Sequence, residues 1–135
     1  MRHLLLWPML LVLASPCVAH DQVVGVTPEE VRFGHVRRLG EAVVLHGDPS
    51  RPEPYVVRIK VGPNNVTMPH SHPKAEGVTV ISGWIGFGIG PVFDKEKGRV
   101  LHPGSFLHLP ARTPHFAWTG PEGAVIQAHG IGPFP

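Results

Sequence analysis

Glycine and proline divide this chain into short segments. There are 16 of each among 135 residues, and they recur in pairs such as Gly62-Pro63 and Pro103-Gly104. Both residues favour turns, and proline interrupts a helix, so long helices are not expected between these points. Short segments between regular turns are typical of β-sandwiches and β-barrels. The spacing therefore predicts an all-β protein with little helix.

The clearest strand pattern is Tyr-Val-Val-Arg-Ile-Lys-Val at positions 55–61. Its odd positions are apolar, which predicts a half-buried strand with Tyr55 and Val57 facing the core. Thr27-Pro28-Glu29-Glu30 supports one helical turn at most. We expect one domain over 20–135, with an N-terminal arm and first strands at 20–54 and the barrel core at 55–135. Further strands are predicted at 42–46, 78–82, 84–89, 105–109, 115–119 and 124–129.

The N-terminal segment has the pattern of a secretory signal. A basic start is followed by the apolar run Leu4 to Ala14, and small residues precede His20. This predicts a signal peptide at 1–19 and a periplasmic or secreted mature protein. The apolar run is shorter than the roughly 20 residues that span a bilayer, so no membrane association is expected after cleavage. A retained anchor and a lipoprotein cut before Cys17 are the alternatives.

Charge gives little support to nucleic-acid binding. The net charge is +2, and no segment combines clustered Lys and Arg with aromatic residues. The expected partner is a small-molecule ligand or substrate. A homodimer is a further option, in which Trp84 and Phe87 would cover a partner sheet.

Metal-capable side chains cluster at the segment His70-Ser71-His72-Pro73-Lys74-Ala75-Glu76. On a strand, His70 and His72 point to the same face because they are two residues apart. Two imidazoles and a carboxylate are most of a divalent metal site. The fourth candidate is His115, which follows a proline-rich turn and begins a strand of its own.

These two blocks resemble the paired motifs of the cupin superfamily. The first is Gly62…His70-x-His72-x3-Glu76-x6-Gly83, and the second is Gly104-x5-Pro110-x-Arg112-x2-His115-x3-Thr119. Three positions depart from the family pattern. Seven residues instead of five separate Gly62 from His70, Arg112 replaces a usual glycine, and Thr119 replaces a usual asparagine. None of these is a metal-ligand position.

The resemblance implies a single-domain cupin β-barrel, also called a double-stranded β-helix or jelly roll. It implies one divalent metal ion on His70, His72, Glu76 and His115, and ligand type alone allows Fe, Mn, Ni, Zn or Cu. The expected protein is an exported metal-binding cupin, and one option is a metal-dependent enzyme of the oxygenase or isomerase type acting on a small molecule. The alternative is a binding protein without turnover.

Candidate catalytic residues come from strand alternation. If the last strand presents Gln127 and His129 inward, they line a pocket with Tyr55, Val57 and Ala117. The candidate catalytic residues are Tyr55, Gln127 and His129. Gln127 and His129 would hydrogen-bond to a metal ligand or a substrate, and Tyr55 and His129 are the candidates for a general base. Small side chains at Ala117, Gly86 and Gly88 are expected to leave an open side for the substrate.

Overall fold

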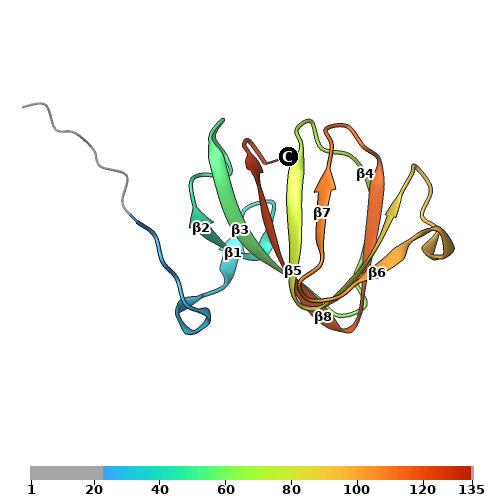
Figure 1. The fold of residues 1–135 in the computed structure, drawn as a ribbon, viewed down its shortest axis with the longest axis horizontal. Helices are drawn as coiled ribbons and strands as arrows, with labels where there is room; N and C mark the ends of the chain where they lie inside the picture. Colours follow the sequence, from blue (N-terminus) through green and yellow to red (C-terminus); the bar gives the residue numbers. More distant parts are fainter. Residues whose placement is uncertain (1–22, 135) are drawn as a thin grey trace, which may run out of the picture.

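The computed structural model describes residues 23–134, so the proposed signal peptide and Cys17 lie outside the described residues. The described part is mostly β-strand, which confirms the all-β prediction (Figure 1). Its only helices are two single 3₁₀ turns, and no helix in it is long and apolar enough to cross a membrane. The elements are η1(Pro28–Glu30), β1(Gly34–Val36), β2(Gly40–His46), β3(Pro54–Val61), β4(Val66–His70), β5(Glu76–Ile89), η2(Lys95–Lys97), β6(Arg99–Leu101), β7(Phe106–Leu109) and β8(His115–Ile131).

Two long strands replace the four short ones expected at 78–82, 84–89, 115–119 and 124–129. β5 and β8 are each continuous, and they pair with each other along nearly their whole length. Their register shifts near Val80/Ser82 and Gly83/Ile85. Such irregularities bend a strand without ending its pairing, so the glycine at position 83, with φ of 67°, marks a bend and not a strand end.

The eight strands form one connected sheet, and the bends of β5 and β8 divide it into two facing parts, called the first and the second sheet below. Residues 76–83 of β5 and 124–131 of β8 join β1, β2, β3 and β7 in the first sheet. Residues 85–89 and 115–119 join β4 and β6 in the second. All pairings are antiparallel, and Figure 1 shows β2 and β3 on one side and β4 and β6 on the other.

The core lies between these sheets. One buried cluster holds Tyr55, Val57, Val78 and Ala128, which confirms the predicted alternation of β3. A second cluster holds Val80, Ile85, Leu101 and Ala124, toward the opposite end of the same strands. The space between the first cluster and the second sheet is where the candidate site lies.

Candidate functional site

Three histidines converge at one end of the sandwich. His70 ends β4 and pairs with His115 at the start of β8, while His72 follows two residues after β4. One ring nitrogen from each lies within 4.8 Å of the others. Three imidazoles at this spacing could form a metal site. The structure therefore brings together three of the four side chains that were predicted to bind a metal.

Each imidazole is held by a partner on its Nδ1 atom. The carbonyl of Met68 lies 2.9 Å from His70 Nδ1, and the carbonyl of Thr113 lies 2.9 Å from His115 Nδ1. A carbonyl can only accept, so both Nδ1 atoms carry the proton. In the neutral form of each ring, Nε2 is then the nitrogen without a proton, as a metal ligand must be. The backbone of the histidine-bearing segments thus fixes the tautomers that a metal requires.

Glu76 supplies the corresponding partner for the third ring. It is buried at the start of β5, and its Oε2 lies 3.1 Å from His72 Nδ1. Its other oxygen, Oε1, accepts a hydrogen bond of 3.3 Å from the Tyr55 hydroxyl. Glu76 is not among the residues whose ligand atoms all lie within 4.8 Å of one another. The structure therefore brings Glu76 to His72, and a direct bond from Glu76 to a metal stays a prediction.

Burial sets the protonation of two groups here. It is the main cause that lowers the pKa of His115. The Thr113 carbonyl opposes this shift, and the nearby His70 and His72 rings add to it. Burial, and then the negative charge of Glu76, raise the pKa of Tyr55 far above its ordinary value. His115 is thus held neutral, and Tyr55 stays a hydrogen-bond donor and is unsuited to act as a base.

A cavity of about 400 Å³ extends from the histidines between the two sheets. The three histidines and Glu76 line it together, with the histidine rings next to one another and Glu76 against His72. Ala117, expected to leave room for a ligand, does line it. The rest of its wall is mainly apolar, including Ile59, Val78, Ile85, Phe87, Leu107 and Ile126.

Gln127 and His129 are not in this cavity, which corrects the prediction from strand alternation. Ile126 and Ala128 line it instead. Gln127 accepts a 3.0 Å hydrogen bond from Arg58 Nε, and His129 stacks on Phe106 with ring centroids 6.1 Å apart. Before the bend at residues 120–123, odd-numbered side chains of β8 such as Ala117 line the cavity. After the bend, the even-numbered side chains of Ile126 and Ala128 line it. Alternation cannot be carried across such a bend from sequence.

Tyr55 and Val57 also lie beside the cavity rather than on its wall, because both are buried in the core. Val57 has no exposed surface, and the Tyr55 hydroxyl is occupied by Glu76. Their predicted inward direction is correct, but other side chains cover them. Tyr55 therefore acts on the site through Glu76.

The glycines of β5 do not leave an open side. A Cβ at Gly86 would lie 1.8 Å from the Trp118 ring, and one at Gly88 would lie 2.1 Å from the Phe116 ring. These glycines make room for aromatic rings on the outer face of the second sheet. Phe87, between them, faces inward and lies 5.7 Å from His115 by ring centroids. It lines the cavity, so it does not provide the surface expected for a partner sheet.

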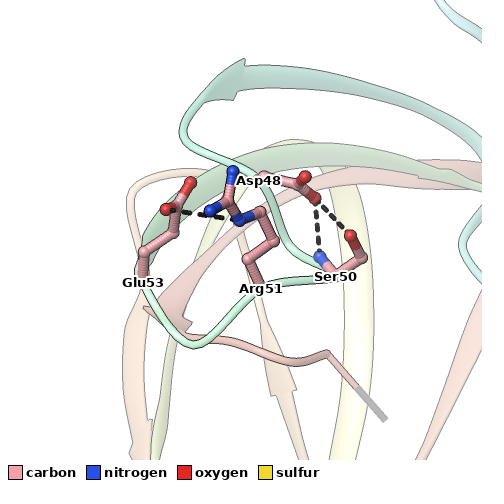
Figure 2. Close-up of polar contacts among 4 residues, drawn as sticks. All are labelled: Asp48, Ser50, Arg51 and Glu53. Carbon is pink, nitrogen blue, oxygen red and sulfur yellow. Dashed lines mark hydrogen bonds and ion pairs between the residues drawn. The ribbon is translucent and has the colours of Figure 1, made fainter.

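Phe134, which was not among the predicted site residues, packs beside His72. The Phe134 ring lies 6.0 Å from His72 and 5.9 Å from Tyr55 by centroids. Its backbone N–H donates to the Pro49 carbonyl in the loop between β2 and β3. Figure 2 shows this loop, in which Asp48 accepts hydrogen bonds of 2.8 and 2.6 Å from the N–H and hydroxyl of Ser50. The loop between β2 and β3 thus helps to position Phe134.

Thr119 and Arg112, two residues that depart from the cupin motif, each make defined backbone contacts. The Thr119 hydroxyl accepts a 2.9 Å hydrogen bond from the Asn65 N–H and donates one of 2.7 Å to the Gly62 carbonyl. It therefore fixes the turn that leads into β4. Arg112, in place of a glycine, has φ of 60°, and its N–H donates to the His72 carbonyl at 2.7 Å. The arginine backbone thus adopts a conformation that favours glycine.

No protein-family model matches the sequence, and no curated protein matches it significantly. Several solved structures share its fold. KdgF from Halomonas sp. is 19% identical with a TM-score of 0.61, over 84% of this chain and 96% of that one. An RmlC-like cupin from Shewanella frigidimarina is 17% identical with a TM-score of 0.60, over 81% and 89%. The polyketide cyclase RemF from Streptomyces resistomycificus is 22% identical with a TM-score of 0.64, over 82% and 80%. The chain therefore has the fold of the cupin superfamily, as its two histidine motifs indicated.

Proposed function

We propose that this protein binds one divalent metal ion through His70, His72 and His115 and acts on a small molecule in the adjoining cavity. The convergence of three imidazoles, each with its Nδ1 engaged, carries the proposal. Such a donor set suits Fe, Mn, Ni, Zn or Cu. When bound, the metal would polarise an oxygen of the small molecule as a Lewis acid.

The surrounding residues have separate tasks in this function. Three protein ligands leave at least one position for water or substrate. Glu76 orients His72, and Tyr55 in turn holds Glu76 by donating to Oε1. Phe134 and the apolar wall exclude water from the ligand in the cavity. Exclusion of water strengthens the electrostatic interactions inside such a site.

Catalysis and binding without turnover are both compatible with this arrangement. The fold neighbours include enzymes, such as the polyketide cyclase RemF and a DMSP lyase structure with a TM-score of 0.58. A different observation favours binding alone. Apart from the three histidines and Glu76, no acidic, basic or histidine side chain lines the described cavity, so a separate general base is missing.

Metal content of the purified protein tests the proposal. We expect about one metal ion per chain by mass spectrometry of the elements, and loss of most of it in His70→Ala and His115→Ala. His108→Ala is the matched control, because His108 is exposed on β7 and outside the cavity. Metal retained at the wild-type level in both cluster variants would refute the assignment.

We also propose that the protein is exported and that the mature chain begins at His20. The basic start, the apolar run and the small residues before His20 support this. Intact-mass measurement on protein expressed with its own N-terminus is the test. A mass that retains residues 1–19, or one that shows lipid on Cys17, would contradict it.

A further inference from the structure

The cavity beside the histidines is nearly free of charged groups. Within residues 23–134, no lysine, arginine or aspartate lines it, and Glu76 is its one carboxylate. Both oxygens of Glu76 already have partners, His72 on Oε2 and Tyr55 on Oε1. An ionic ligand would therefore meet no free counter-charge on the protein wall.

Apart from the histidines and Glu76, the polar aliphatic side chains of the wall are uncharged: Asn65, Thr67, Ser71 and Thr119. Thr119 is committed to the Asn65 N–H and the Gly62 carbonyl. The side chains of Asn65 and Thr67 lie 3.3 Å apart as hydrogen-bond partners, and both line the cavity on the β4 side. They can exchange hydrogen bonds with a hydroxyl or carbonyl group. They cannot neutralise a carboxylate, phosphate or ammonium group.

The apolar part of the wall is suited to a ring. Phe87 lies against His115, and Ile59, Val78, Leu107 and Ile126 come from the facing strands. The volume of about 400 Å³ is within the range of small-molecule sites, roughly 300–1,000 Å³. Ala117 keeps this volume open directly beside His115 because its side chain is short.

From these features we infer that the ligand is an uncharged, largely apolar ring compound that carries one hydroxyl or carbonyl oxygen. This inference rests on the proposed function, in which that oxygen faces the metal. A buried charge without a partner is strongly unfavourable, whereas an apolar ring gains from leaving water. The protein wall by itself, without the charge of the metal, therefore selects against organic acids, phosphate esters and amines of the same size.

Three naphthalene derivatives of matched size test the ligand class: 2-naphthol, 2-naphthoate and 2-naphthylmethylammonium. Their binding to the wild-type protein is measured by calorimetry at pH 7, once with zinc chloride and once with EDTA. In EDTA we expect 2-naphthol to bind at least about tenfold more tightly than either ion, because charge burial is unfavourable. Equal or tighter binding of an ion in EDTA would overturn the inference.

A cavity-filling variant locates the binding. Ala117→Leu should weaken 2-naphthol binding at least about tenfold while zinc still binds, because the added atoms occupy the cavity beside His115. Ala111→Leu is the control, since the same substitution there is on an exposed turn outside the cavity. Unchanged 2-naphthol binding in folded, zinc-binding Ala117→Leu would overturn the inference.

The two proposals fail in different ways. If zinc binds but the three probes show equal affinity in EDTA, the ligand class is wrong and the metal function stands. If 2-naphthol binds selectively but zinc does not bind, the metal function is wrong and the apolar cavity still selects its ligand as inferred.

Discussion

The bond between Glu76 and His72 allows a quantitative test of how the metal site is built. Glu76 Oε2 lies 3.1 Å from His72 Nδ1, and the carboxylate is buried. Glu76→Gln keeps the shape and a neutral acceptor but removes the charge. Loss of such an outer partner typically weakens metal binding about 10- to 100-fold, which corresponds to about 1.4–2.7 kcal/mol.

Thermal unfolding converts this loss into a measurable shift. At a metal concentration about 100 times the wild-type Kd, binding stabilises the folded protein by about 2.7 kcal/mol. For a domain of this size, about 1 kcal/mol moves Tm by ~4 °C, so the wild type should gain ~11 °C. With 10- to 100-fold weaker binding, Glu76→Gln should gain only about 2–6 °C at the same concentration.

The comparison with His72→Ala decides the role of Glu76. His72→Ala removes one of three converging rings, so almost no metal-induced shift in Tm is expected. If Glu76→Gln loses the shift as completely as His72→Ala, Glu76 binds the metal directly and our account of it as an orienting residue is wrong. A shift equal to the wild type would also refute the reasoning, because the Nδ1 partner would then have no effect.

Two further outcomes follow from particular hydrogen bonds. Thr119→Val leaves the Asn65 N–H and the Gly62 carbonyl without their partner, and should lower the free energy of unfolding by about 2 kcal/mol and Tm by ~8 °C in calorimetry. Hydrogen bonds from the hydroxyl and N–H of Ser50 lower the pKa of Asp48. A lowered folded-state pKa stabilises the protein above the unfolded-state value and not in acid. Asp48→Asn should therefore lower Tm slightly at pH 7 and leave it unchanged at about pH 2. An equal decrease in Tm at both pH values would contradict this reasoning.

Much of the fold and part of the site could be read from local sequence. Alternation over 55–61 predicted which side chains of β3 face inward, and the structure agrees. The short spacing of His70 and His72 restricts both rings to one neighbourhood, whatever the rest of the chain does. The turn before His115 then needed only the antiparallel pairing of β4 with β8 to complete the cluster.

Other features depended on where distant segments meet. The face of β8 that points to the cavity changes at the bend over 120–123. Gln127 and His129 therefore lie outside the cavity, although they share one face of the strand as predicted. Gly86 and Gly88 were predicted to leave space for a substrate. The rings of Trp118 and Phe116 fill this space, because the register of β5 with β8 places them opposite the two glycines.

The sequence by itself determined the all-β class and the set of three imidazoles, because strand period and ligand chemistry are properties of neighbouring residues. Only the tertiary structure decided that the Tyr55 hydroxyl lies against Glu76, and that the Phe134 ring packs against His72 and Tyr55. These contacts join residues far apart in the chain through strand register and a loop that holds the C-terminal segment. Register and loop geometry arise when whole sheets pack together, so no local pattern contains them.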